Sequence, residues 1–234
     1  MTDKSAKRYD KIKKHFESEA RIFDANFFKI LPFYHEMISA LVSCVPFKKG
    51  VKIRALDLGC GTGNITKALK ERYPGASVLC VDLAENMLAL ARSKLSGFKR
   101  VEYWLGDIRS LDYSKKYNVI ISSLALHHVE EKEKGVLYRK IYGALTKGGV
   151  FYNADLIVAS NNYLAGMYLE KWKAFMRRSF SVSKINNVIL KHKDDEDRPV
   201  KLATEMAFLD KAGFKDLDVV WKYYNFAVYG GKKR

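Results

Sequence analysis

The chain has 234 residues, 48% of them hydrophobic, and its 42 Lys and Arg against 26 Asp and Glu give a net charge of +16. These figures predict one folded domain with an inserted cap, and exclude a disordered chain and a disulfide-stabilised miniprotein. No apolar run reaches the ~18 residues of a membrane span, and the charged N-terminus is unlike a signal peptide. Three cysteines, an odd number with no CxxC pair, favour a reducing, cytoplasmic location.

The first 50 residues are expected to form a helical N-terminal cap. Apolar residues recur three and four positions apart between Ser5 and Val45, and Pro32 is expected to begin a second helix there. Pro46 and Gly50 bracket a short linker. We therefore divide the chain into a cap segment, residues 1–50, and a main domain, residues 51–234.

Short apolar runs alternate with amphipathic stretches from residue 53 onward. Strands are expected at 53–58, 77–82, 101–105, 118–123 and 150–155, with helices at 64–73, 85–95 and 131–145. Strands that alternate with helices of about ten residues predict right-handed βαβ units and a parallel sheet.

This alternation stops after residue 155. Residues 161–192, within an insertion of about 160–198, are predicted to be helical, and Pro199 is expected to open a further helix that Gly213 caps. Two β-rich runs, 217–223 and 225–229, are too close for a helical crossover and are predicted to pair antiparallel. The expected fold is α/β: a Rossmann-like, seven-stranded, mostly parallel sheet with an antiparallel edge hairpin, a helical N-terminal segment and an inserted cap.

Gly59, Gly61 and Gly63 lie where the first predicted strand gives way to a helix. Glycines there permit a tight turn and let a ligand approach the backbone beside a helix N-terminus, although a glycine loop alone is also a simple turn. Asp82 ends the second strand, where a carboxylate can accept both hydroxyls of a ribose, and Asp107 follows the third, where it can accept from the amine of adenine. The three strand ends together predict a cofactor that contains adenosine.

NAD is the alternative cofactor, because the same spacing suits a dinucleotide. Three features argue against it: Asp57 precedes the glycines, Asp107 supplies a second carboxylate, and the sheet is expected to end in an antiparallel hairpin.

Residues from about Ile53 to Arg234 resemble the class I S-adenosylmethionine-dependent methyltransferases. The resemblance rests on ALDLGCGTGN, VLCVDLAENML, GDI, SSLALHHV, LTKGGVFYNADL and the LDKAGF…YNFAVYGGKK ending. A second pattern, Asp24 with Pro32-Phe33-Tyr34 and the Lys211-Ala-Gly-Phe ending, is similar to carboxy-S-adenosylmethionine synthases. Gly61 and the position of Arg198 depart from that pattern, which favours ordinary S-adenosyl-L-methionine as the cofactor.

The resemblance implies a role for each matching residue. Asp57 would hold the methionyl ammonium, Asp82 the ribose and Asp107 the adenine amine. The other residues implied in cofactor binding are Gly59, Cys60, Gly61, Gly63, Leu83, Met87, Ile108, Ser123 and, by the synthase pattern, Tyr34. Leu83 and Ile108 would sandwich adenine, whereas Cys60 is also consistent with simple packing.

His127 and His128 follow the fourth predicted strand, on the rim where an acceptor is expected. His128, or failing that His127, is the candidate to position or deprotonate the acceptor, and buried packing is the alternative for each. Two adjacent histidines need further ligands to bind a metal, and Asp155 is the one obvious candidate. We therefore expect no metal.

The acceptor is expected to be a small molecule, methylated on oxygen, nitrogen or sulfur. Basic residues crowd the two caps, which leaves an RNA (tRNA) substrate as an alternative, alongside a carboxy-S-adenosylmethionine synthase-like enzyme and a non-catalytic cofactor-binding protein. The basic residues are Lys4, Lys7, Arg8, Lys11, Lys13 and Lys14, and Lys171, Lys173, Arg177, Arg178, Lys184, Lys191 and Lys193. Aromatic residues expected to line the acceptor pocket, or else to pack in the core, are Tyr9, Phe16, Tyr34, Tyr163, Tyr168, Trp172 and Phe175.

Overall fold

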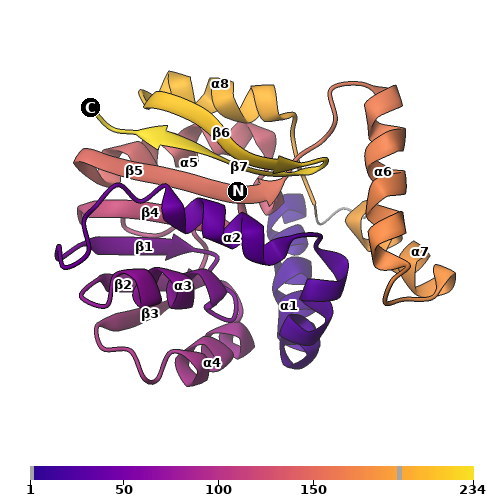
Figure 1. The fold of residues 1–234 in the computed structure, drawn as a ribbon, viewed down its shortest axis with the longest axis horizontal. Helices are drawn as coiled ribbons and strands as arrows, with labels where there is room; N and C mark the ends of the chain where they lie inside the picture. Colours follow the sequence, from indigo (N-terminus) through magenta and orange to yellow (C-terminus); the bar gives the residue numbers. More distant parts are fainter. Residues whose placement is uncertain (1–2, 194–196) are drawn as a thin grey trace.

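The structure, a computed structural model, describes residues 3–193 and 197–234. A seven-stranded sheet with strand order β3-β2-β1-β4-β5-β7-β6 forms its centre, and helices cover both faces (Figure 1). The strands are β1 (Arg54–Leu58), β2 (Ser77–Asp82), β3 (Val101–Leu105), β4 (Tyr117–Ser123), β5 (Leu145–Leu156), β6 (Lys215–Tyr223) and β7 (Phe226–Lys232). β1 to β5 pair parallel, and β7 pairs antiparallel with both β5 and β6. The predicted fold class is confirmed.

Eight α-helices connect and cover the strands within the described ranges. They are α1 (Asp3–Ile30), α2 (Tyr34–Ser43), α3 (Asn64–Arg72), α4 (Glu85–Lys94), α5 (Glu131–Ala144), α6 (Asn162–Met176), α7 (Val182–Lys193) and α8 (Leu202–Ala212), and a 3-10 turn, η1 (Leu126–His128), follows β4. None of these helices has the length and apolar character needed to cross a membrane.

Apolar side chains bury the central parallel strand β1 on both faces. Ala55, Leu56 and Leu58 of β1 are each 0% exposed, as a central parallel strand requires. Asp57 interrupts this run and is also buried, although it carries a carboxylate. Because burying an unpaired charge is costly, a buried carboxylate at the end of a central strand marks a position with a polar partner.

One segment differs from the sequence-based prediction. Pro199 does not open a helix: α8 begins at Leu202, and the residues before it are extended, with Val158 N donating to Val200 O at 3.1 Å. This bridge to the end of β5 stabilises an extended backbone there, which the sequence pattern alone does not reveal. The stretch 161–192 is helical as predicted and consists of two helices, α6 and α7.

Helix α1 lies at the edge of the sheet where the parallel strands end (Figure 1). It contacts α4 on one side and α6 on the other. Trp172 of α6 donates its indole N–H to Ile30 O, the last residue of α1, at 2.7 Å. The inserted helices therefore support α1 from outside. The side chains of Lys4, Lys191 and Lys193, three of the predicted basic residues, lie outside those that the structure describes.

Candidate cofactor and acceptor site

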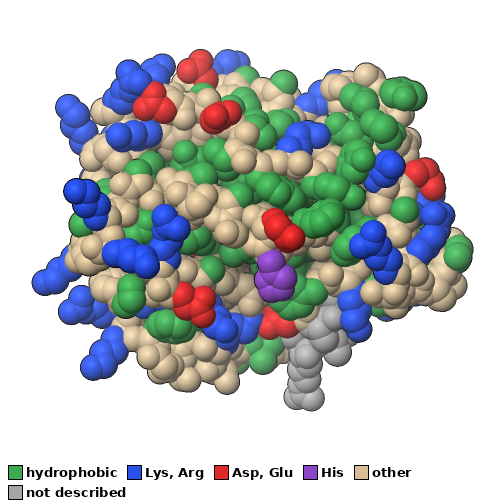
Figure 2. All heavy atoms as spheres, viewed as in Figure 1, with side chains coloured by type: hydrophobic (Ala, Val, Ile, Leu, Met, Phe, Trp, Pro, Cys, Tyr) green, Lys and Arg blue, Asp and Glu red, His purple; other side chains and the backbone are tan. Residues whose placement is uncertain are grey.

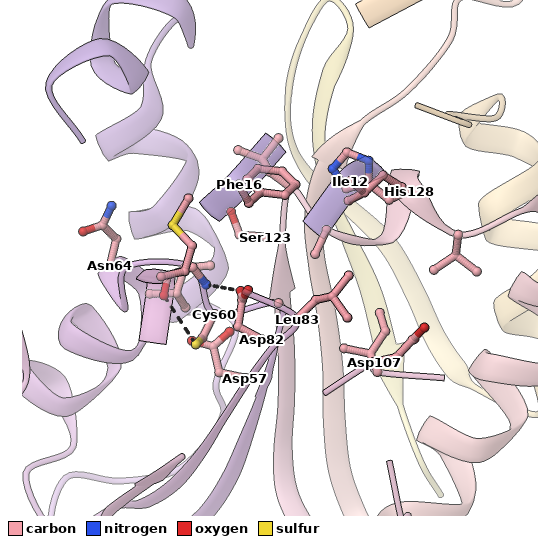
Figure 3. Close-up of a pocket in the computed structure, with 18 of the residues that line it drawn as sticks. Ile12, Phe16, Asp57, Cys60, Asn64, Asp82, Leu83, Asp107, Ser123 and His128 are labelled. Carbon is pink, nitrogen blue, oxygen red and sulfur yellow. Dashed lines mark hydrogen bonds between the residues drawn. The ribbon is translucent and has the colours of Figure 1, made fainter. Parts of the chain in front are cut away.

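A pocket opens where β1 and β4 end, at the point where the strand order reverses direction. Open α/β sheets bind ligands at this switch point. The space that its lining residues surround, including the part that is open to solvent, has a volume of about 910 Å³. Figure 3 shows Asp57, Cys60 and Asp82 at one end and Phe16, Ile12 and His128 at the other.

The glycine loop turns tightly between β1 and α3. Gly59 N and Cys60 N both donate to Val81 O at 2.9 Å, which pins the loop to the end of β2. Gly59 has φ +70°, and a Cβ there would lie 2.2 Å from Ala125 Cβ. Gly61 has φ +52° but open space around it. Gly59 is thus required by the fold, whereas Gly61 keeps a stretch of backbone open toward the pocket.

Asp57 presents a carboxylate oxygen to the pocket. Thr66 Oγ1 donates to Asp57 Oδ2 at 2.6 Å, and Oδ1 is buried with no hydrogen-bond partner among the described residues. Burial, with a smaller contribution from the charge of Asp82, raises the pKa of Asp57 to about 7. A buried carboxylate with one unpaired oxygen is suited to a cationic ligand group.

Asp82 links the glycine loop to the start of α4. Its Oδ2 accepts from Gly61 N at 2.8 Å (Figure 3). Its Oδ1 accepts from Ala84 N at 3.0 Å. Burial and the nearby charge of Glu17 raise the pKa of Asp82, while these backbone N–H groups oppose the rise. The carboxylate is held in a fixed orientation at the mouth of β2, as a ribose-binding acid requires.

Asp107 lines the pocket but already has a charged partner. Arg109 Nε lies 3.0 Å from both carboxylate oxygens of Asp107, and Arg109 Nη1 donates to Glu133 Oε1 at 2.9 Å. The Arg109 guanidinium carbon lies 3.3 Å from the centre of the Tyr9 ring. An adenine amine would therefore share the Asp107 carboxylate with Arg109. The contact between Asp107 and adenine stays a prediction.

Side-chain contacts hold helix α1 to the start of α4 and to the glycine loop. Glu17 accepts from Glu85 N at 2.7 Å and Asn86 N at 2.9 Å, and thereby caps α4. Asp24 accepts from Thr62 Oγ1 at 2.7 Å and pairs with Lys94 Nζ at 2.6 Å. These contacts place α1 across the pocket as one of its walls.

Aromatic and apolar side chains form the end of the pocket where the acceptor is expected. Tyr9, Ile12 and Phe16 of α1 face it with Tyr34 of α2 and His128 of η1. Phe16 and His128 meet edge to face, with ring centroids 5.4 Å apart. The aromatic residues of the insertion do not line this pocket. Tyr163 is 79% exposed, Tyr168 packs on Tyr224, and Trp172 and Phe175 pack in or against the hydrophobic core.

The two histidines take different positions. His128 lines the pocket, whereas His127 is buried behind it. His127 Nδ1 lies 2.5 Å from Asp155 Oδ1, and His127 N donates to Asp155 Oδ2 at 3.0 Å. Burial lowers the pKa of His127, but the carboxylates of Asp155 and Asp197 together raise it above its ordinary value. Of the two histidines, His128 is therefore the one that lines the pocket.

The structure brings most of the predicted cofactor-binding residues to one pocket. Those that line it are Tyr34, Asp57, Gly59, Cys60, Gly61, Asp82, Leu83, Met87, Asp107, Ile108 and Ser123. Gly63 does not: it caps α3 with φ +83° and packs against Leu95. Sequence reasoning missed the tethering roles of Glu17 and Asp24, and the placement of Asp197 beside His128. Each depends on a contact between segments far apart in the chain.

Comparisons with known proteins agree with this arrangement. Residues 55–149 match a family model described as a methyltransferase domain. The chain is 25% identical to the carboxy-S-adenosyl-L-methionine synthase of Campylobacter hominis, over 96% of this chain and 97% of that protein. It is 27% identical to the protein of that name from a Nitratiruptor species, over 95% of each chain.

Solved structures show the same fold. A complex titled DhpI-SAM-HEP superposes with a TM-score of 0.66 at 15% identity and covers 98% of both chains. Phosphoethanolamine N-methyltransferase 2 of Haemonchus contortus superposes with a TM-score of 0.63 at 22% identity, over 87% of this chain and 43% of that one.

Proposed function

We propose, since this chain belongs to the class I S-adenosylmethionine-dependent methyltransferases, that it transfers a methyl group from S-adenosyl-L-methionine to an oxygen, nitrogen or sulfur atom of a small-molecule acceptor. The observation that carries the proposal is one pocket with buried acids at one end and an apolar, aromatic end closed by Phe16 and His128. The odd number of cysteines, none of them disulfide-bonded, supports placing this reaction in the cytoplasm.

The residues of the pocket fit this cofactor. The unpartnered Oδ1 of Asp57 suits the methionyl ammonium, and the fixed carboxylate of Asp82 suits the ribose hydroxyls. Leu83 and Ile108 line the same pocket and supply apolar surface for adenine. The glycine loop leaves space beside Gly61 for the amino-acid portion.

The bound sulfonium would supply an activated methyl group, so the chain needs neither a covalent intermediate nor a strong acid. Its own task is to align an acceptor atom with the methyl group and to keep water away. Ile12 and Phe16 exclude water from that end of the pocket. His128, on the acceptor side, orients the acceptor and accepts its proton where methylation requires loss of one.

A second candidate reaction transfers a carboxyl group from a carboxylic-acid donor, whose bond to that group breaks, to the methyl carbon of the cofactor, which loses a proton. It is favoured by the whole-length similarity to proteins named carboxy-S-adenosyl-L-methionine synthase. An added carboxylate calls for a cationic partner, and the acceptor end of this pocket presents aromatic and apolar side chains instead. Arg198 N donates to His127 O, and its Nη1 donates to Asp197 O. These contacts support methyl transfer as the first candidate.

Labelled cofactor distinguishes the two reactions. The protein is incubated with S-adenosylmethionine labelled at the methyl carbon and a panel of phenols, amines, thiols and carboxylic acids. We expect label in an acceptor together with S-adenosylhomocysteine. Label retained in a carboxylated cofactor would instead establish the second candidate.

The variant His128→Asn tests the role of His128 in the same assay. It should lower turnover by about 100-fold or more with little change in cofactor affinity, because general-base catalysis contributes about that much. Equal turnover in the variant and the wild type would remove His128 from the mechanism.

A further inference from the structure

Three side chains with metal-ligating atoms converge beside the acceptor end of the pocket. His127 and His128 come from η1, and Asp197 comes from the end of the insertion. His128 Nδ1 lies 3.2 Å from Asp197 Oδ1, and His127 Nε2 lies 3.6 Å from the same oxygen. One ligand atom from each residue fits within 4.8 Å of the others.

The two separations from Asp197 Oδ1 are compatible with ligand atoms that share one cation. Metal–nitrogen and metal–oxygen bonds of about 2.0–2.2 Å hold neighbouring ligand atoms roughly 3.0–3.6 Å apart. The side chains are also shielded from water, with 7% of His127, 13% of His128 and 6% of Asp197 exposed. The cluster is thus compact enough and buried enough to hold an ion.

A buried carboxylate orients the first of these ligands. Asp155 is 1% exposed and accepts from both the backbone N–H and, through Nδ1, the ring of His127. Asn153 Nδ2 in turn donates to Asp155 Oδ2 at 3.1 Å. A carboxylate on Nδ1 fixes the ring and directs Nε2 outward, which is the arrangement of a carboxylate–histidine–metal unit. Asp155 is therefore an outer support for the cluster and not one of its ligands.

We propose that His127 Nε2, His128 Nδ1 and Asp197 Oδ1 bind a divalent transition-metal ion of the zinc class. Two imidazoles and one carboxylate form a ligand set used by zinc and by other divalent ions of the first transition row. The ion takes the place of the proton between His127 and Asp197, because a ligating imidazole nitrogen must be deprotonated. Among the described cations near the cluster, Arg8 donates to His128 O, Arg198 Nη1 donates to Asp197 O, and Lys134 pairs with Glu205.

Three protein ligands leave a coordination position for a further donor atom, and in the metal-bound protein the ion, in place of the His128 ring, would promote loss of the acceptor's proton. His128 also lines the pocket, so an acceptor with an oxygen, nitrogen or sulfur lone pair is the chemical class that would occupy it. This second step rests on the proposed function, whereas metal binding itself does not. The experiment below therefore measures metal binding without cofactor or acceptor.

The full chain, stripped with a chelator, is titrated with Co²⁺ followed by visible absorption and then with competing Zn²⁺, and bound metal is quantified by elemental analysis. We expect one equivalent of metal per chain and ligand-field bands that Zn²⁺ abolishes. Asp197→Asn should weaken binding by at least tenfold, and Asp155→Asn by roughly 10–100-fold, because outer carboxylates contribute that much.

Two control variants separate this site from other side chains. His35→Gln removes a histidine of α2 that stacks on Phe28, and Glu130→Gln removes an acid two residues after His128 that pairs with Lys132. Both should bind metal like the wild type, and the far-ultraviolet circular dichroism of every variant should match it. Absence of stoichiometric binding in the wild-type protein, or unchanged affinity in Asp197→Asn, would overturn the proposal whatever the outcome of the methyl-transfer assay.

Discussion

Burial raises the pKa of Asp57 to about 7, because the carboxylate leaves water at the end of β1 and Asp82 adds a second negative charge nearby. The folded protein without ligand therefore holds the Asp57 proton more tightly than the unfolded chain does, in which the pKa of this group is near 3.8. The stability that this proton confers is fully present below pH 4 and is lost as pH rises through about 7. A cationic ligand group reverses this preference, since it stabilises the carboxylate.

We accordingly expect cofactor affinity to fall as pH decreases below about 7, by up to tenfold for each pH unit, because Asp57 must lose its proton to bind the ammonium. Calorimetry in buffers of different ionisation enthalpy should detect proton release on binding at pH 6. Asp57→Asn should bind weakly and without this pH dependence. An affinity that is constant between pH 5.5 and 8 in the wild type would contradict the role given to Asp57.

A separate prediction concerns Asp82, whose carboxylate is already oriented by Gly61 N and Ala84 N. Asp82→Ala should weaken binding of S-adenosylmethionine by about 1–3 kcal/mol, as two charge-assisted bonds to ribose are lost. Isothermal titration measures the change, and Asp112→Ala serves as the control because Asp112 contacts the exposed Ser114. An unchanged affinity in the Asp82 variant would show that the ribose lies elsewhere.

At the scale of elements, α1 forms a wall of the pocket, and a few side-chain contacts that mutation can remove hold it in place. Asp24 holds it to Lys94 of α4 and to Thr62 of the glycine loop. Asp24→Asn should raise the dissociation constant of the cofactor by about fivefold, in keeping with a partly exposed ion pair. Asp10→Asn is the matched control on the same helix, because Asp10 pairs only locally with Lys14.

Hydrogen exchange reports whether this tether acts through α1. The amides of α1 should exchange faster in Asp24→Asn than in Asp10→Asn, since the loss of the contact to α4 lets the helix open more often. Equal exchange in the two variants, together with equal cofactor affinity, would mean that α1 is held by its apolar face alone.

The sequence predicted elements well where local pattern and burial agree. β2 has the predicted bounds, because it is a short, largely buried apolar run between turn residues; β3 also has them, although it contains Glu102 and is more exposed. It failed at Pro199, where pairing with the end of β5 keeps the backbone extended. The pocket acids were predictable, since strand ends meet at one edge of a sheet.

The contacts of Glu17 with α4 and of Asp197 with His128 were not predictable. They join segments whose proximity depends on how the two caps pack against the sheet. Asp107 and Arg109, which pair with each other, are only two residues apart in the chain. The Asp-x-Arg spacing was the signal that could have revealed this pair.

At the scale of the whole molecule, the chain carries a net charge of +16. Figure 2 shows Lys and Arg side chains spread around this face, with apolar atoms across its middle. Trp172, Phe175 and Phe180, which interleave with basic residues in the sequence, pack in or against the core and offer no row of exposed rings for stacked bases.

We therefore expect RNA to bind only non-specifically and to accept no methyl group. Titration of tRNA at rising salt should show weak binding that disappears near physiological ionic strength. Tight, methylation-competent binding that is lost when Lys171, Arg177 and Arg178 are neutralised would establish an RNA substrate instead.

The position of the cofactor in the pocket decides the role of each residue named above. A crystal structure of the complex with S-adenosylhomocysteine shows that position directly. We predict the ammonium at Asp57 Oδ1, both ribose hydroxyls at the Asp82 carboxylate, and the sulfur facing the space between Phe16 and His128. A ligand bound outside this pocket, or one whose sulfur faces away from His128, would contradict the account.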